Sequence, residues 1–361
     1  MKPTLRSALF SVVLLLIVAL ACTVEGGRPS SAFAAGRAES AAPGSLNATV
    51  PVTDSFAVYL PAITGGAALP PLAVDVQDRA AVLAFFQQYH QTAPAADMGW
   101  TGNHAACNAG TTSIAYRQSL QTLVNFFRAM AGVPAGIVFR DDYSAKAQQA
   151  ALMMSVNGEL NHTPPPSWAC YTPEGAEAAN ASNLSIWFGE KSDYHGIKGQ
   201  MEDEGAGNFA VGHRRWILCP NTQYMGTGDV PESGSNWAAN ALWVMDDSAL
   251  QARPAVRDDF VAWPPSGYVP RSLVYGRWSF MLRDADFSAA GVRVRHGGDD
   301  LHIEVEQEDF GYCENTLVWV PTIDWSGLGA GDQTFQVEIR NVQIDGQPRT
   351  FTYDVTVILG Q

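Results

Sequence analysis

Two short histidine segments carry the clearest chemical potential of this sequence. His162 stands in the segment 161–165 (Asn-His-Thr-Pro-Pro), and His213 stands in the segment 212–218 (Gly-His-Arg-Arg-Trp-Ile-Leu). Neutral imidazole is the commonest protein ligand for Zn²⁺ and a frequent general acid or base near neutral pH. The stretch between the two segments is rich in Glu, Asp and Asn. A fold that brings both histidines together would therefore build a polar cleft.

The chemistry of such a cleft depends on which acidic residues join it. Two histidines and one carboxylate leave a position on Zn²⁺ for a water molecule, whose pKa the metal lowers. Asp203 and Glu204 are the acids nearest to His213, and Asp203 also suits general acid–base catalysis with either histidine. The sequence has no His-Glu-x-x-His segment and no Gly-x-Ser-x-Gly elbow. Any site must therefore arise by tertiary convergence.

Helices in the first part of the chain are predicted to position these groups. Residues 78–91 have a helical pattern, and residues 112–131 show apolar residues at three- and four-residue steps. A further helix is expected over residues 142–156, with Asp142 as its N-cap. His162 then follows one short step beyond the end of that helix.

Strands are predicted in the second part of the same region. Residues 201–204 suggest a turn of helix, whereas residues 213–218, 224–229 and 239–245 each favour a strand. Helices that precede strands in this way are typical of an α+β arrangement around one sheet.

Four motifs in the right order resemble one known family. Asn125 and Arg128 form an Asn-x-x-Arg motif similar to that of the CAP superfamily (cysteine-rich secretory proteins, antigen 5 and pathogenesis-related 1 proteins). His162, which follows an alanine-rich helix, is similar to the first cavity histidine of that family. Residues 212–218 resemble its Gly-His signature, and residues 224–228 resemble its closing glycine strand.

The resemblance, over roughly residues 110–247, implies an α-β-α sandwich. It implies a cleft where His162 and His213 face each other, and structural roles for Asn125 and Arg128. Family members often add two acidic residues and form a tetrad that holds a divalent metal. Here Zn²⁺ on His162 and His213 is the corresponding expectation.

This sequence departs from the acidic part of the family pattern. Ser182, followed by Asn183, stands where the family has Glu, and Glu177 could replace that acid only if the loop bends back. Asp203 and Glu204 are the candidates for the second acid. The expected ligand cleft is lined by His162, His213, Glu177, Ser182, Asn183, Asp203 and Glu204, and the catalytic candidates are His162, His213 and Asp203.

The C-terminal part has a different pattern. After a segment rich in Pro and Trp at 262–267, apolar residues alternate on both sides of the turns at 297–300 and 345–346. This pattern predicts β-hairpins with six or seven strands, and a small antiparallel sandwich of immunoglobulin or fibronectin-III kind over 262–361. Its expected role is spacing, docking or binding at a surface.

The N-terminal part predicts export. Residues 1–21 combine a basic start with a short apolar run, as in a signal peptide. Residues 22–73 are rich in Ala, Gly, Ser and Pro and predict a flexible linker, which leaves 74–261 for the CAP-like domain. Cys22 resembles a bacterial lipoprotein acceptor, but a cleaved and soluble product is favoured over a lipid anchor. In both cases the mature protein is not expected to span a membrane.

The net charge excludes one class of partner, and the remaining cysteines predict disulfide bonds. The net charge of −14 argues against nucleic acid as a partner. Cys107 is predicted to pair with Cys170, since each lies in a Trp-flanked loop beside a long helix, whereas Cys219 and Cys313 could pair or stay free.

Two functional classes follow from these features. We expect a secreted or surface-associated binding protein whose cleft holds an extracellular lipid, peptide, glycan or divalent ion. The alternative is a secreted metal-dependent hydrolase that acts on peptide or cell-envelope material.

Overall fold

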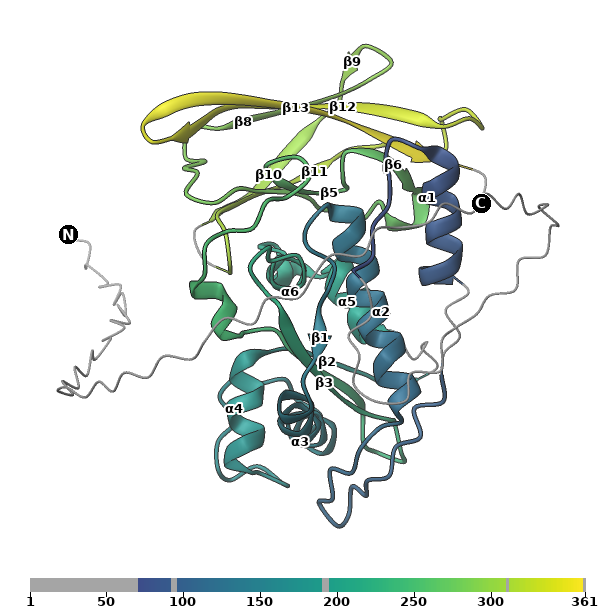
Figure 1. The fold of residues 1–361 in the computed structure, drawn as a ribbon, viewed down its shortest axis with the longest axis vertical. Coiled ribbons are helices and arrows are strands. Elements are labelled where there is room, and N and C mark those ends of the chain that lie inside the picture. Colours follow the sequence, from purple (N-terminus) through teal and green to yellow (C-terminus); the bar gives the residue numbers. More distant parts are fainter. Residues whose placement is uncertain (1–70, 92–95, 190–194, 310–311, 360–361) are drawn as a thin grey trace, which may run out of the picture. The chain divides into compact units, whose positions relative to one another are not determined.

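A computed structural model describes residues 71–91, 96–189, 195–309 and 312–359 (Figure 1). These residues all belong to one unit that spans 63–361. The predicted signal peptide, Cys22 and nearly all of the predicted linker lie outside the described residues. Within the described ranges, no helix combines the length and the apolar character that a membrane crossing requires.

A four-stranded sheet forms the centre of the CAP-like part. Its order is β1 (Val138–Phe139), β3 (Tyr224–Val230), β4 (Ala238–Trp243) and β2 (Ser182–Trp187). β1 is parallel to β3, and the other neighbours are antiparallel. Side chains of β4 alternate between two hydrophobic clusters, because Ala241 and Trp243 join one cluster and Leu242 joins the other. The sheet is therefore buried on both faces.

Helices cover the two faces of this sheet (Figure 1). α3 (Asp141–Asn157) and α4 (Pro173–Ala181) pack on the face that carries Ala241 and Trp243. The other face is covered by α2 (Ile114–Ala131), α5 (His195–Glu202) and α6 (Gly212–Ile217). The expected α-β-α sandwich is confirmed.

Glycine in β3 permits a close approach of α3. A Cβ atom on Gly228 would lie 2.1 Å from the backbone carbon of Ala147, and one on Gly226 would lie 2.5 Å from the Cβ of Tyr143. The alanine-rich face of α3 therefore rests almost directly on the strand backbone.

Two local predictions are wrong. Residues 213–217 of the predicted strand 213–218 belong to α6, because this segment is enclosed on several sides and lacks the simple alternation of a half-buried strand. The N-cap of α3 is Arg140 instead of Asp142. Asp142 lies inside the first turn and accepts hydrogen bonds from the Arg140 guanidinium.

The C-terminal part consists of two packed sheets. One sheet has the order β10 (Ile303–Asp309), β11 (Thr316–Pro321), β7 (Trp278–Met281) and β5 (Val261–Trp263). The other has the order β6 (Gly267–Pro270), β13 (Gln347–Ile358), β12 (Gln333–Ile344), β8 (Gly291–His296) and β9 (Asp299–Asp300). Trp278 and Phe335 meet between the sheets, with ring centroids 6.0 Å apart. The all-β region is confirmed, but β6 runs parallel to β13 and the short edge strands raise the strand number above the predicted six or seven.

One hydrophobic core joins the N-terminal helices to the C-terminal sheets. Phe127 of α2 packs against Trp263 of β5 at a centroid distance of 5.7 Å, and both side chains are fully buried. α1 (Arg79–Phe86) continues as a π-helical turn at Gln87–Gln91 and contacts β6. The predicted boundary between 261 and 262 falls inside β5.

Two disulfide bonds lie within the described residues. Cys107 pairs with Cys170, which confirms the predicted bridge. Cys219 pairs with Cys313, the pairing that the sequence left open, and joins the segment after α6 to the segment before β11.

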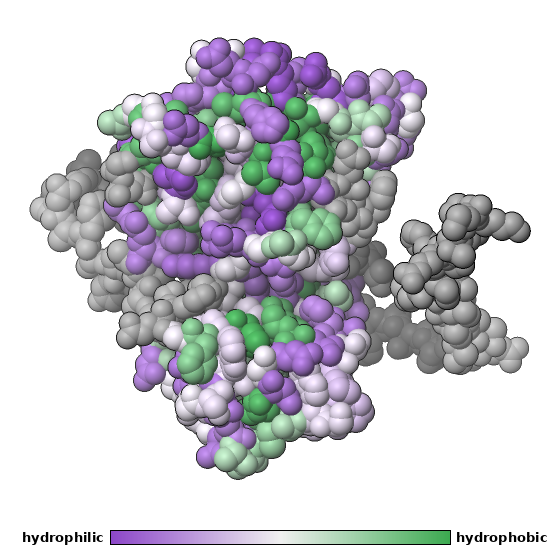
Figure 2. All heavy atoms as spheres, turned by 180° about the vertical axis from the view of Figure 1, so that it is seen from behind, coloured by the Kyte–Doolittle hydropathy of each residue, from purple (hydrophilic) through white to green (hydrophobic). Residues whose placement is uncertain are grey.

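The surface is mixed in character. On the face turned away from Figure 1, hydrophobic side chains gather mainly in the upper half, where Figure 1 places the C-terminal sheets (Figure 2). A mostly hydrophilic zone separates them from smaller hydrophobic patches in the lower half (Figure 2).

Candidate functional site

His213 is held by a buried carboxylate. After α5 the chain turns at Asp203, which has a left-handed backbone with φ 55°. Asp203 Oδ1 lies 2.7 Å from His213 Nδ1, and Oδ2 accepts the His213 backbone N–H at 3.0 Å. A carboxylate only accepts, so Nδ1 carries the proton and Nε2 is the acceptor nitrogen that faces away from Asp203. The Asp203 side chain is 0% exposed and that of His213 is 26% exposed, which gives a fixed but reachable imidazole.

His162 has the same tautomer, but a backbone carbonyl group sets it instead of a carboxylate. It lies on the loop after α3, with an exposed side chain. Its Nδ1 donates to the carbonyl oxygen of Ala179 in α4 at 2.8 Å, which leaves Nε2 as an acceptor. Asn161 Oδ1 accepts the Thr163 N–H at 2.8 Å and shapes this loop. Among the described residues, no hydrogen bond and no shared partner joins His162 to His213.

Asn125 and Arg128 of α2 form hydrogen bonds with backbone groups of other segments. Asn125 exchanges two hydrogen bonds with the backbone of Ile137, at 2.8 and 3.0 Å. Arg128 is fully buried, and burial lowers its pKa to about 9. Its guanidinium donates to four carbonyl oxygens, which belong to Pro134, Ile217, Cys219 and Thr222. The pair therefore fixes the chain directly before β1 and directly after α6.

The central part of the chain matches one protein family. The family model of the cysteine-rich secretory protein family, CAP, matches residues 121–246. The chain contains a CAP domain. The matched range includes Asn125, Arg128, His162 and His213, so the family resemblance of the sequence is confirmed.

Other comparisons add little. No curated protein matches the chain. Among solved structures, the chain is similar to the selenomethionine form of PcoC, a copper resistance protein from Escherichia coli, with 17% identity, a TM-score of 0.22, and coverage of 29% of this chain and 99% of that chain. A second structure of PcoC, described as methionine rich, has 17% identity, a TM-score of 0.20, and coverage of 27% and 92%. Neither likeness is strong enough to support an argument.

A buried polar chain connects His213 to the middle of the CAP sheet. Asn183 of β2 donates to the His213 carbonyl oxygen at 3.0 Å and to Gln200 Oε1 at 3.2 Å. Gln200 donates to Asn240 Oδ1 at 2.9 Å, and Asn240 donates to Asp229 Oδ1 at 2.8 Å. Four elements thus contribute one continuous network, which rigidifies the segment that carries His213.

The network ends at a carboxyl group that the sequence pattern did not predict as a site residue. Asp229 of β3 is 2% exposed, and its burial raises its pKa to about 6. Hydrogen bonds from Thr227 at 2.7 Å, from Asn240 and from Tyr116 at 3.4 Å oppose that rise. An Asp that follows two glycines inside an otherwise buried strand is the only sequence signal for it.

The remaining predicted cleft residues lie in separate settings. Glu177 forms a salt bridge with Lys146 at 2.7 Å and is half exposed. Ser182 is buried, with no partner for its Oγ among the described residues, and Glu204 is exposed. Within the described ranges, no three His, Cys, Asp or Glu side chains form a group suited to a metal ion.

The two arginines after His213 anchor the CAP domain to the C-terminal sheets. Arg214 is buried and donates to the carbonyl oxygens of Met201 at 2.7 Å and Arg277 at 2.9 Å. Arg215 is buried and donates to the carbonyl oxygen of Glu314 at 3.0 Å. The sequence did not predict this role, which places His213 at the junction of the two parts.

Proposed function

We propose that this protein is a secreted binding protein whose CAP domain presents His213, with His162 as a second contact, to an extracellular ligand. The observation that carries the proposal is the pairing of His213 with the fully buried Asp203. It fixes ring, tautomer and backbone at once, so the Nε2 acceptor is preorganised for a hydrogen-bond donor. Hydroxyl groups of glycans and amide groups of peptides supply such donors.

Export is part of this proposal. Two disulfide bonds support an oxidising compartment, because cytosolic thiols are normally kept reduced. The predicted signal peptide at 1–21 supports the same location.

One observation favours metal-assisted hydrolysis as a second candidate. A histidine that donates Nδ1–H to a carboxylate is the usual arrangement behind a metal-bound Nε2. The rest of the donor set does not fit, however. Asp203 is engaged by His213, Glu177 is engaged by Lys146, and Ser182 offers no carboxylate. A catalytic zinc site usually takes three protein ligands, and the two histidines alone do not supply that set.

The two candidates can be separated with the full mature chain. Wild type and His162→Ala/His213→Ala are compared on a glycan array, a peptide array and in Zn²⁺ titration by calorimetry. We expect saturable binding of one glycan or peptide class that survives EDTA and is lost in the double variant. His302→Ala, an exposed histidine of the C-terminal part, is the matched control.

Catalysis would give a different result. Turnover of a bound peptide or glycan that disappears both in EDTA and in the double variant would replace the binding function with hydrolysis. Equal binding by wild type and the double variant would overturn the role of the histidines.

A further inference from the structure

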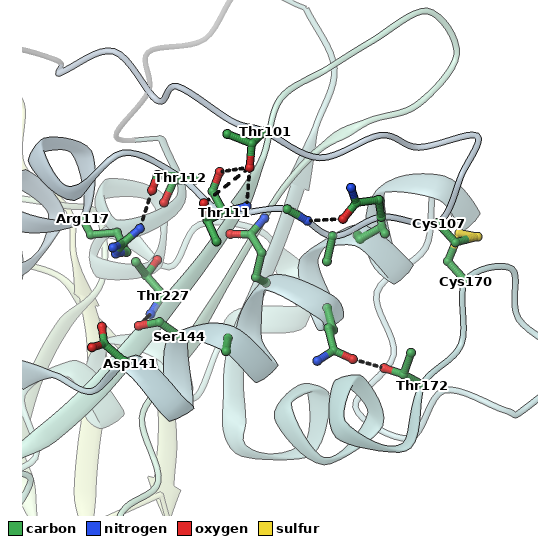
Figure 3. A pocket seen from close by; sticks show the side chains of 17 residues that line it. Thr101, Cys107, Thr111, Thr112, Arg117, Asp141, Ser144, Cys170, Thr172 and Thr227 are labelled. Atoms are coloured by element: carbon green, nitrogen blue, oxygen red, sulfur yellow. Dashed lines mark hydrogen bonds between the residues drawn. A yellow bond between two sulfur atoms is a disulfide. The ribbon is translucent and has the colours of Figure 1, made fainter.

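A large cavity lies between the segment 101–112 and helix α3, away from both histidines. Its volume is about 790 Å³, within the range of small-molecule sites. Neither His162, His213 nor Asp203 lines it. The lining residues are Thr101, Cys107, Asn108, Ala109, Gly110, Thr111, Thr112, Arg117, Asp141, Ser144, Ala145, Gln148, Gln149, Leu152, Cys170, Thr172 and Thr227 (Figure 3).

The wall of this cavity is held in place before any ligand arrives. The Cys107–Cys170 disulfide closes one end, well away from Arg117 (Figure 3). The Thr101 N–H donates to the Thr111 carbonyl oxygen at 3.0 Å, and the Thr111 N–H donates to Thr101 Oγ1 at 3.0 Å. A preformed wall lowers the entropy cost of binding.

The lining is chemically suited to hydroxyl groups. Six of the 17 lining residues carry a hydroxyl group and three carry a carboxamide, so the wall offers many groups that can hydrogen-bond to a ligand. Thr112 is only 4% exposed, and its Oγ1 has no hydrogen-bond partner in the part of the chain that the structure describes. A buried hydroxyl without a partner is costly, and a ligand can supply the missing bond.

Two further lining groups retain donors. Gln149 Oε1 accepts from Thr172 Oγ1 at 2.6 Å, which leaves its amino group for a ligand. Ser144 Oγ accepts the Thr227 N–H at 3.2 Å and keeps its own proton to donate. Side-chain groups of this kind both donate and accept, as sugar hydroxyls do.

The charged side chains that line the cavity determine which ligand charge it favours. Arg117, which is half-buried, donates one N–H to the Thr112 carbonyl oxygen, so the rest of the guanidinium fork can bind a carboxylate. Asp141 also lines the cavity, and the chain as a whole carries a net charge of −14. A polyanion is therefore disfavoured, whereas a single carboxylate beside Arg117 is favoured.

We propose that this cavity is a second binding site, for a short saccharide that carries a carboxylate. The sugar hydroxyls bind Thr112, Ser144 and Gln149, and the carboxylate binds Arg117. An extended peptide is less suited, since the backbone of the wall is already paired between Thr101 and Thr111 and offers no free edge.

The test is a cycle of two ligands and two proteins. Cellobiouronic acid, a disaccharide with one carboxylate, and its neutral counterpart cellobiose are titrated by calorimetry into the full mature chain and into Arg117→Gln. We expect Arg117→Gln to weaken the acidic sugar by about 10- to 100-fold and to leave the neutral sugar nearly unchanged. Arg140→Gln, which removes a surface arginine paired with Asp142, is the matched control and should change neither.

A second variant keeps the test valid if Arg117→Gln disturbs the fold. Thr112→Val should weaken both sugars several-fold without lowering the thermal midpoint, because the hydroxyl that it removes has no partner. Binding should also persist in His162→Ala/His213→Ala, which separates this site from the proposed histidine site. Absence of saturable binding by either sugar, or an equal loss of both in Arg117→Gln, would overturn the proposal.

Discussion

Asp203 accepts hydrogen bonds from His213 through both carboxylate oxygens. Oδ1 lies 2.7 Å from the ring Nδ1, and Oδ2 lies 3.0 Å from the backbone nitrogen. Arg277 holds the Asp203 carbonyl oxygen at 3.0 Å, so the acid is itself fixed from the C-terminal part. The imidazole thus has one orientation set by two regions of the chain.

Replacing this acid should loosen the histidine. Asp203→Asn keeps the size of the side chain but removes the charge that favours the Nδ1–H tautomer. We expect the free energy of unfolding to fall by about 1–3 kcal/mol, because hydrogen bonds to a buried charged group are lost. Urea denaturation measures the loss, and ¹⁵N spectra of the His213 ring report the tautomer. An unchanged tautomer in the variant would contradict the role assigned to Asp203.

Arg128 should be among the most sensitive positions of the CAP domain. Arg128→Met retains most of the apolar volume but leaves four buried carbonyl oxygens without their donor. We expect a loss of about 3 kcal/mol or more in the free energy of unfolding. For comparison, Arg140→Met removes a surface arginine and should change stability by less than about 0.5 kcal/mol. Similar losses in the two variants would refute the structural role of Arg128.

Asp229 should make stability depend on pH. Its folded pKa is about 6, above the ordinary aspartate value of 3.8, so the folded protein keeps a proton that the unfolded chain releases. Between these values the folded state binds more protons, and stability must therefore fall as pH rises. The shift corresponds to about 3 kcal/mol.

Asp229→Asn isolates this effect. The unfolding free energies of wild type and variant are measured by urea denaturation from about pH 3.5 to about pH 7, a range that spans both pKa values. The wild type should lose stability relative to the variant as the pH rises. A difference that stays constant over this window would show that Asp229 ionises normally.

Gly228 should tolerate no side chain. A Cβ atom at this position would lie 2.1 Å from the backbone of Ala147, so α3 would have to move off β3. We expect Gly228→Ala to lower stability by about 1–3 kcal/mol or to prevent folding. Gly291→Ala is the control, since a Cβ atom there meets nothing within 4 Å. Equal thermal midpoints for both variants would disprove the close approach.

Local pattern predicted much of the CAP domain. The spacing of apolar residues located α2 and α3, and the glycines at 226 and 228 marked the strand on which α3 rests. Such features depend on neighbours in the sequence or on one contact with a strong steric demand. The Cys107–Cys170 bridge followed from similar local context.

The parts that the sequence could not predict depend on several distant elements at once. α6 was mistaken for a strand because its residues contact the CAP domain and the C-terminal sheets together. The network from Asn183 to Asp229 draws on β2, α5, β4 and β3, and no spacing along the chain reveals it. The expectation that Glu177 lines the cleft rests on the family resemblance, but in the structure Glu177 forms a salt bridge with Lys146.

The Cys219–Cys313 bridge, together with Arg214 and Arg215, has a practical consequence for dissecting this protein. A fragment that ends at residue 261 would contain Cys219 without Cys313. It would also leave Arg214 and Arg215 without the carbonyl oxygens of Arg277 and Glu314. The fragment that keeps His213 would thus lose the scaffold next to it. The CAP domain and its C-terminal sheets should therefore be expressed, transferred between proteins and exchanged by recombination as one piece.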